Sequence, residues 1–287
     1  MTATPLAPWL TPEGFSAPGV RAVLREASMV AEAGRFAIGA IERRRVRRRS
    51  PYAGSAAVRH ATPVILVPGF LAGDATLAPM ARVLREAGYR TYRSSIHVNA
   101  GCTLNAAAQL ESRLESIVLR RGSRVQIVGH SLGGMLARGL AVRRPDLVAG
   151  IVTLGSPMLA PGAHHAALTK SVEMLVRLSR AGWPGLMSED CVAGDCARQS
   201  FDESRRPLPG GVAFTAIYSK RDGIVDWRAC VDPLAVAVEV TASHGGLAFD
   251  PRVIAEVVRA LESSAGLETR RSFLAGSDRA DAPRPGA

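Results

Sequence analysis

The stretch from Arg124 to Ala137 reads Arg-Val-Gln-Ile-Val-Gly-His-Ser-Leu-Gly-Gly-Met-Leu-Ala. It begins as an apolar run rich in β-branched residues, and good helix formers follow with no loop between the two parts. The stretch therefore predicts a strand that turns directly into a helix, with Ser131 at the corner. Gly129 and Gly133 flank this serine in the spacing G-x-S-x-G, where any side chain would clash with the neighbouring strand or helix.

Such a turn would push the Ser131 hydroxyl out of the sheet and aim the backbone N–H of Leu132, at the helix N-terminus, at a developing negative charge. A lone G-x-S-x-G also occurs by chance, and a capping serine is the alternative interpretation. The surrounding elements, with an acid and a histidine further along the chain, favour a catalytic serine. At these residues the chain resembles the α/β-hydrolase superfamily, and Gly-His-Ser-Leu-Gly-Gly is most similar to its bacterial lipase and esterase branch.

The resemblance implies the α/β-hydrolase fold, a doubly wound and mostly parallel sheet of about six strands with a helical or loop-rich cap insertion. Strands and helices do alternate from the strand at 63–67 to the strand at 148–154, and later strands are expected at 212–219 and 235–240. The expected organisation is an N-terminal helical extension with an Arg-rich linker (1–61), a hydrolase domain (62–265) with its cap at about 158–210, and a disordered tail (266–287). Within these parts, helices are expected at 20–45, 77–88, 104–121 and 166–180, and a loop-rich stretch is expected at 181–211.

The composition permits a large core but also gives a strongly basic protein. The chain has 287 residues, of which 47% are hydrophobic, a formal net charge of +11 and an isoelectric point near 10.6. Such a charge ordinarily suggests nucleic acid or an anionic membrane surface. Lys170 and Lys220 are the only lysines and alanine is abundant, which indicates a compositional bias of the coding sequence. No nucleic-acid partner is therefore expected.

The densest basic cluster lies outside the predicted hydrolase domain, where six of the seven residues from Arg43 to Arg49 are arginine. A solvated segment is the simpler interpretation. An apolar helix with a basic end could instead make a peripheral contact with an anionic membrane. The chain has no apolar run of transmembrane length, and its first 20 residues do not follow a secretory signal pattern. We expect a cytoplasmic protein, with membrane association as the alternative.

The four cysteines leave the disulfide question open. Cys191 and Cys196 are close enough in sequence to close a small loop, whereas Cys102 and Cys230 have no evident partner. Free thiols are expected in a cytoplasmic protein. A disulfide between Cys191 and Cys196 would instead favour an extracytoplasmic location.

A nucleophilic serine needs a base within hydrogen-bond reach and a third group that fixes the tautomer of that base. In the superfamily these residues follow the serine in the order acid, then histidine. Asp222 lies in the loop after the strand that follows the cap, and His244 lies in the loop after the last strand. The resemblance therefore implies a triad of Ser131, Asp222 and His244, with Asp226 as the alternative acid.

The resemblance also assigns the oxyanion hole to the backbone N–H groups of Leu132 and Phe70, with Leu71 as the alternative to Phe70. Bacterial lipases of this fold usually have a histidine where this chain has Pro68. His97 follows a strand and could line the pocket, although a structural loop histidine is the simpler interpretation. His164 and His165 have no metal-ligand residues at suitable spacing beside them, so neither a metal nor a cofactor is expected.

These residues predict acyl transfer through an acyl-serine, in a lipase or esterase acting on small-molecule or lipid esters. An acyltransferase, a thioesterase, a short-chain esterase and a non-catalytic binding protein are the alternatives. The predicted cap carries large apolar side chains, which either pack on the rest of the fold or line an acyl pocket: Leu168, Val172, Leu175, Val176, Trp183, Leu186 and Met187. If they line the pocket, acyl chains longer than acetyl should be preferred.

Overall fold

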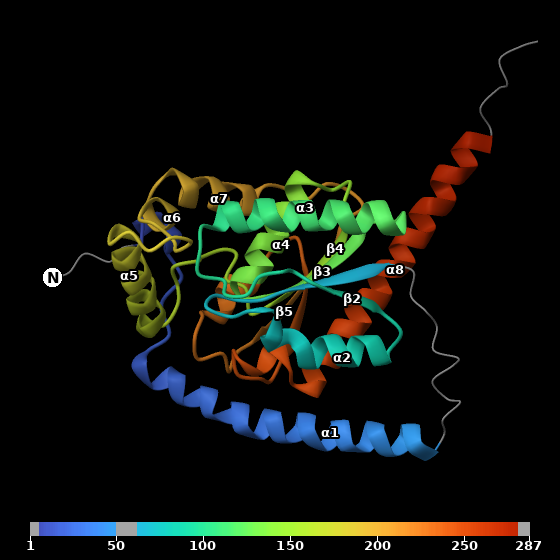
Figure 1. Cartoon of the computed structure of the whole chain (residues 1–287), viewed down its shortest axis with the longest axis horizontal. Helices are drawn as coiled ribbons and strands as arrows, with labels where there is room; N and C mark the ends of the chain where they lie inside the picture. The colour runs from blue at the N-terminus through green and yellow to red at the C-terminus, as the bar shows by residue number, and fades with distance from the viewer. Residues whose placement is uncertain (1–5, 50–61, 281–287) are drawn as a thin grey trace, which may run out of the picture.

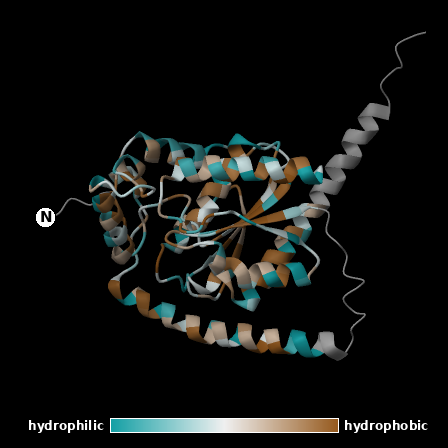
Figure 2. Cartoon of the chain, in the orientation of Figure 1, coloured by the Kyte–Doolittle hydropathy of each residue, from teal (hydrophilic) through white to brown (hydrophobic). Residues whose placement is uncertain are grey.

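The computed structural model describes residues 6–49 and 62–280. Six strands form one sheet in the order β2-β1-β3-β4-β5-β6, and every neighbouring pair is parallel (Figure 1). The strands are β1 (Pro63–Val67), β2 (Arg90–Arg93), β3 (Val125–His130), β4 (Val148–Leu154), β5 (Ala213–Ser219) and β6 (Val236–Val240). β1, β3 and β4 are buried along their whole length, which agrees with their mainly apolar sequences (Figure 2). The predicted fold class is confirmed.

Helices cover both faces of the sheet. On one face, α3 (Thr103–Arg121) and α4 (Leu132–Arg143) pack their buried apolar residues against β1, β3 and β4. On the other face, α2 (Ala78–Glu86) and α8 (Pro251–Ala280) do the same. The two cores are therefore separated by the sheet, as the alternation of strands and helices predicts.

The strand order reverses direction at one place that determines where a ligand can bind. From β1 the chain moves outward to β2, and it then returns to place β3 on the other side of β1. In open parallel sheets, a crevice forms at such a switch point, beyond the carboxyl ends of the two strands. The loops that leave β1 and β3 at this point carry Phe70 and Ser131.

The insertion between β4 and β5 forms three helices, α5 (Ala166–Arg180), α6 (Asp190–Ala193) and α7 (Asp195–Arg205). The predicted bounds of α5 are correct, and the stretch expected to be rich in loops at 181–211 also contains the helices α6 and α7, which were not predicted. α7 contacts α3 and α4, and its buried residues include Phe201, which packs on η1, and the small residues Cys196, Ala197 and Ser204. Such small residues give a weak apolar pattern, which explains why the sequence did not indicate this helix.

The chain begins with two 3-10 helices, η1 (Pro8–Leu10) and η2 (Val20–Ser28), and η2 leads into α1 (Met29–Arg49). α1 runs along the outside of the molecule (Figure 1) and contacts α8. The predicted linker at 50–61 lies outside the described residues. At the other end, α8 continues to Ala280, beyond the expected start of disorder at 266, because no proline interrupts the sequence after Pro251 until Pro283. No helix in the described ranges is long and apolar enough to cross a membrane.

Candidate active site

The turn between β3 and α4 holds Ser131 in a strained backbone conformation. Its φ is 51° and its ψ is −121°, a region that residues with side chains rarely adopt. The Ser131 N–H donates a hydrogen bond of 2.8 Å to the Leu154 carbonyl oxygen of β4. A Cβ atom at Gly129 would collide with the backbone of Gly133, and one at Gly133 would collide with the Val67 carbonyl oxygen of β1. Both glycines of the motif are therefore required by close backbone packing.

The structure brings Asp222 and His244 together at the ends of β5 and β6. His244 Nδ1 lies 2.7 Å from Asp222 Oδ2, and both side chains are nearly buried. The other carboxylate oxygen, Oδ1, accepts hydrogen bonds from the Ile224 and Val225 N–H groups at 2.8 and 2.9 Å. Asp222 is thus held in one orientation, with Oδ2 left to accept the Nδ1–H of His244.

Asp226, the alternative acid, is engaged elsewhere. Its Oδ1 caps the short helix η5 (Trp227–Cys230) by accepting the Arg228 N–H at 3.1 Å. Its Oδ2 accepts the Ser16 N–H at 3.2 Å and lies 3.4 Å from an Arg228 guanidinium nitrogen. Of the two candidate acids, Asp222 is therefore the one placed against the histidine.

The histidine next to Ser131 connects the serine turn with the His244 loop. His130 Nε2–H donates to the His244 carbonyl oxygen at 2.9 Å, and the two imidazole rings have centroids 4.9 Å apart. Burial lowers the pKa of His130 to about 3, with a further lowering by His244, so His130 is neutral. Burial also lowers the pKa of His244, but the charge and hydrogen bond of Asp222 and the charge of Glu26 outweigh this effect and raise it above its usual value.

The loop after β1 carries the predicted oxyanion donors. Leu71 has a positive φ of 56° and donates its N–H to the Asn99 carbonyl oxygen at 2.9 Å, so this amide is already engaged. Phe70 lies at the cavity with Ser131 and Leu132. Leu132 is the first residue of α4, where backbone N–H groups have no partner within the helix. The geometry favours Phe70 over Leu71 as the second donor.

Asn99, which sequence reasoning did not single out, holds this loop in place. Its side-chain Nδ2 donates to the Pro68 carbonyl oxygen at 2.9 Å, and its backbone N–H donates to the Ala72 carbonyl oxygen at 2.8 Å. Together with the bond from Leu71, these contacts link the loop after β2 to the loop after β1. The only sequence signal was the position of Asn99 in the loop that follows the strand at 90–93, and its burial becomes evident only in the structure.

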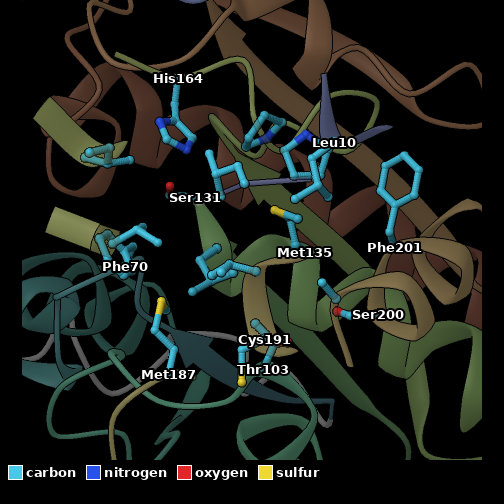
Figure 3. Close-up of a pocket in the computed structure, with 18 of the residues that line it drawn as sticks. Leu10, Phe70, Thr103, Ser131, Met135, His164, Met187, Cys191, Ser200 and Phe201 are labelled. Carbon is cyan, nitrogen blue, oxygen red and sulfur yellow. The ribbon is translucent and has the colours of Figure 1, made fainter. Parts of the chain in front are cut away.

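An apolar cavity opens over Ser131 (Figure 3). The core contributes Phe70, Leu132 and Met135 to its wall, and the cap contributes residues that include His164, Leu168, Val172, Met187 and Phe201. Trp183 is 61% exposed and does not line the cavity, and His97 is exposed as well. The cap thus faces the serine through part of its predicted apolar set.

Comparisons with known proteins agree with this architecture. A profile of the PGAP1-like alpha/beta domain family matches residues 104–182. The mature form of the Bacillus licheniformis lipase BlEst2 aligns over 70% of this chain and 91% of that chain, with 15% identity and a TM-score of 0.55. Its propeptide form aligns over 66% and 47%, with 16% identity and a TM-score of 0.50. The chain therefore has the α/β-hydrolase fold. Among curated proteins, none matches its sequence.

Part of the candidate site comes from outside the predicted hydrolase domain (62–265). Two glutamates of the N-terminal extension, Glu26 and Glu32, accept hydrogen bonds from the loops that carry Asp222 and His244. No local sequence pattern indicates these contacts, because more than 190 residues separate the partners in the chain.

The cysteines approach one another in a way that the sequence spacing did not indicate. All four are free thiols, and Cys196 Sγ lies 3.3 Å from Cys102 Sγ. The sulfur atoms of Cys102, Cys191 and Cys196 lie within 4.8 Å of one another, the only set of this kind in the parts of the chain that the structure describes. Three sulfur ligands suit a soft metal ion. His164 and His165 do not form such a group: His165 caps α5, and His164 lines the cavity.

Replacing Asp222 by Asn should lower the pKa of His244, because the charge and the hydrogen bond that raise it are both lost or weakened. Asp226→Asn is the matched control, since this carboxylate bonds Ser16 and Arg228 instead. NMR titration of the histidine ring protons measures both variants. A larger shift for Asp226→Asn than for Asp222→Asn would show that the acid has been assigned to the wrong residue.

Proposed function

We propose that this protein is a serine hydrolase that cleaves carboxylic esters through an acyl-serine intermediate. The observation that carries the proposal is the position of Ser131, strained at a strand-to-helix turn and opening into an apolar cavity. The buried Asp222–His244 pair at the same edge of the sheet supplies the residues that such a serine needs. The resemblance in fold to a bacterial lipase agrees with this chemistry.

In the first half of the reaction, His244 accepts the hydroxyl proton of Ser131 while Ser131 Oγ attacks the ester carbonyl carbon. The N–H groups of Phe70 and Leu132 stabilise the resulting oxyanion, and loss of one such donor typically raises the barrier by about 3 kcal/mol. His244 then gives the proton to the leaving alcohol. Asp222 stabilises the protonated imidazole and fixes its orientation throughout.

In the second half, a water molecule activated by His244 attacks the acyl-serine and releases the acid. An alcohol in place of water would give a new ester, and a thioester would enter by the same route. An acyltransferase and a thioesterase are therefore the alternative activities of the same residues. Product analysis with and without an added alcohol distinguishes hydrolysis from transfer.

The cavity suggests the substrate class. Its wall combines aliphatic and sulfur-containing side chains from the core and the cap, and such a wall favours an acyl chain over a polar group. Burying each methylene group contributes about 0.8 kcal/mol, so each added carbon should raise kcat/KM several-fold until the cavity is full. We infer a preference for acyl chains longer than acetyl, with short-chain esters as the alternative.

Ser131→Ala should abolish hydrolysis of p-nitrophenyl esters and leave the fold intact, because the substitution removes only the reacting hydroxyl. A fluorophosphonate probe should label the wild-type protein once, at Ser131, and should not label the variant. Mass spectrometry of the labelled peptide and circular dichroism of both proteins provide the measurement. Turnover by Ser131→Ala, or label at another residue, would reject the mechanism.

Leu168→Trp should lower kcat/KM for long-chain p-nitrophenyl esters and spare the acetyl ester, because the larger side chain fills part of the cavity. Met174→Trp is the matched control, since Met174 lies on the same helix but is 54% exposed and outside the cavity. The measurement is kcat/KM as a function of acyl length in all three proteins. A steady decrease from the acetyl ester upward in the wild type would leave only a short-chain esterase.

A further inference from the structure

The N-terminal extension turns charged side chains toward the two loops that carry the proposed acid and base. Glu26, in η2, accepts the Gly223 N–H and the His244 N–H on Oε1, both at 2.9 Å, and the Gly245 N–H on Oε2 at 3.2 Å. One carboxylate thereby joins the residue after Asp222 to His244 itself. Hydrogen bonds to a carboxylate are stronger than those between neutral groups, and three on one carboxylate fix it firmly.

A second glutamate, six residues further along the chain, supports the same loop. Glu32 is 1% exposed, and its Oε1 accepts the Ser243 N–H at 2.8 Å and the Ser28 hydroxyl at 3.0 Å. Its Oε2 accepts the Ser243 hydroxyl, which in turn accepts the Gly246 N–H at 2.9 Å. The backbone on both sides of His244 is therefore bonded to the N-terminal extension.

The loops after β5 and β6 pack so closely on η2 and α1 that three of their glycines have no space for a side chain. A Cβ atom at Gly223 would collide with the Ala22 carbonyl oxygen, and one at Gly246 would collide with the Glu32 carboxylate. One at Gly245 would lie 2.7 Å from the sulfur of Met29. Both catalytic loops thus approach the extension closely along their backbone.

We propose that Glu26 is a positioning residue of the active site, which fixes the separation of Asp222 and His244 by bonding the backbone of both loops. The inference rests on the proposed hydrolase function. It makes the extension before residue 62 part of the catalytic apparatus, although neither glutamate reaches the substrate cavity.

The charge of Glu26 also affects the pKa of His244, an effect that can be measured separately from the stability of the fold. The groups facing His244 are Asp222 from the loop after β5, neutral His130 from the end of β3, and Glu26 from η2. Burial lowers the pKa of His244, whereas Asp222 and then Glu26 raise it. His244 must be neutral to accept the serine proton, so kcat/KM should increase as the pH rises through this pKa. Removing the charge of Glu26 lowers the pKa and moves that increase to lower pH.

The test compares Glu26→Gln with wild type and with Glu42→Gln, an exposed glutamate of α1 outside these contacts. In a plot of kcat/KM against pH, we expect Glu26→Gln to lower the constant value reached at high pH (the plateau) by about tenfold or more. We also expect the rise that precedes this plateau (the acid limb) to occur at lower pH than in the wild type. The same two changes should appear in the rate of fluorophosphonate labelling of Ser131. Glu42→Gln should match the wild type in both assays.

The outcomes separate this inference from the proposed function. If the wild type neither hydrolyses esters nor reacts with the probe, the hydrolase proposal itself fails. If the wild type reacts and Glu26→Gln reacts equally fast with an unmoved acid limb, only the positioning role is overturned. A lower plateau with an unmoved limb also overturns it, since a merely structural role would give that result.

Glu26→Asp decides the question if Glu26→Gln does not fold. The shorter side chain keeps the charge but withdraws it from both loops, so kcat/KM at high pH should fall about tenfold and its increase with pH should move to lower pH, because the weaker charge raises the pKa of His244 less. An unchanged kcat/KM at high pH, or an increase that does not move, would overturn the proposal.

The opposite side of the same segment carries a separate, apolar surface. Outward-facing residues of η2 and α1 include Leu24 (71% exposed), Val30 (78%), Ile38 (60%) and Ile41 (51%). The inward-facing side holds Glu32, Arg35 and Phe36 instead. Figure 2 shows hydrophobic positions along the length of α1. One side of this helix is therefore apolar and exposed to solvent, and such a surface commonly marks an interaction site.

Exposed arginines identify the partner that this face fits. Arg44 and Arg45 lie three and four positions after Ile41 in the sequence, so they are on the same side of α1 as Ile41. Arg21 and Arg25 of η2 are exposed as well. We propose that this surface, defined by Leu24, Val30, Ile38 and Ile41 with the flanking arginines, docks on an anionic lipid membrane. The apolar side chains would enter the interface, and the arginines would pair with lipid phosphates.

Sedimentation with phosphatidylcholine vesicles, with or without phosphatidylglycerol, tests this docking. Wild type should bind only the anionic vesicles, and added salt should weaken binding. Ile38→Glu should reduce binding about tenfold, because the charge must leave water. Leu119→Glu, at an 85% exposed leucine on α3, should bind as wild type does. Failure of the wild type to bind, equal binding by Ile38→Glu, or a dimer dissociated by that substitution would overturn the proposal.

Discussion

The site depends on a single constraint, the left-handed backbone of Ser131 at the end of β3. A conformation of this kind typically costs about 1–3 kcal/mol and persists only where the surroundings over-determine it. Here the two strands that flank β3, β1 and β4, constrain the backbone around Ser131. β4 accepts the serine N–H through Leu154, while the backbone of β1 packs so closely on α4 that position 133 must be glycine. The packed parallel sheet therefore holds the hydroxyl in place, and loops alone would not.

Polar contacts also fix the loops around Ser131. Asn99 holds the loop after β1, and the Ser219 hydroxyl bridges the ends of β5 and β6 by donating to the Ala242 carbonyl oxygen at 2.6 Å. Glu26 and Glu32 hold the loops of the acid and the histidine from outside the sheet. Each contact bonds backbone groups that would otherwise be buried without partners, a loss of about 1–3 kcal/mol per group.

Local sequence patterns were sufficient to predict the elements whose structure depends on neighbouring residues. The apolar run before Ser131, the glycines around it and the bounds of α5 could be predicted, because each depends on residues a few positions apart. The missed features depend on distant partners. Nothing near Glu26 indicates that its carboxylate meets His244, 218 positions away, and nothing near Cys102 indicates that it meets Cys196. α7 was missed for a related reason, since its small buried residues become apolar contacts only against α3 and α4.

The polar side of α1 faces the rest of the molecule because its charged side chains find partners there. A surface helix usually buries its apolar stripe, but the loop that carries His244 and the start of α8 lie beneath α1, and both provide hydrogen-bonding or charged partners for its polar side chains. Arg35 pairs at 2.7 Å with Asp250, a fully buried carboxylate at the start of α8, and Glu32 is bonded on both oxygens. Buried charges are tolerable only when paired in this way, so the polar side of the helix must face inward. The apolar residues are then left facing water by necessity, and a lipid surface would remove them from water without disturbing the contacts that hold the catalytic loops.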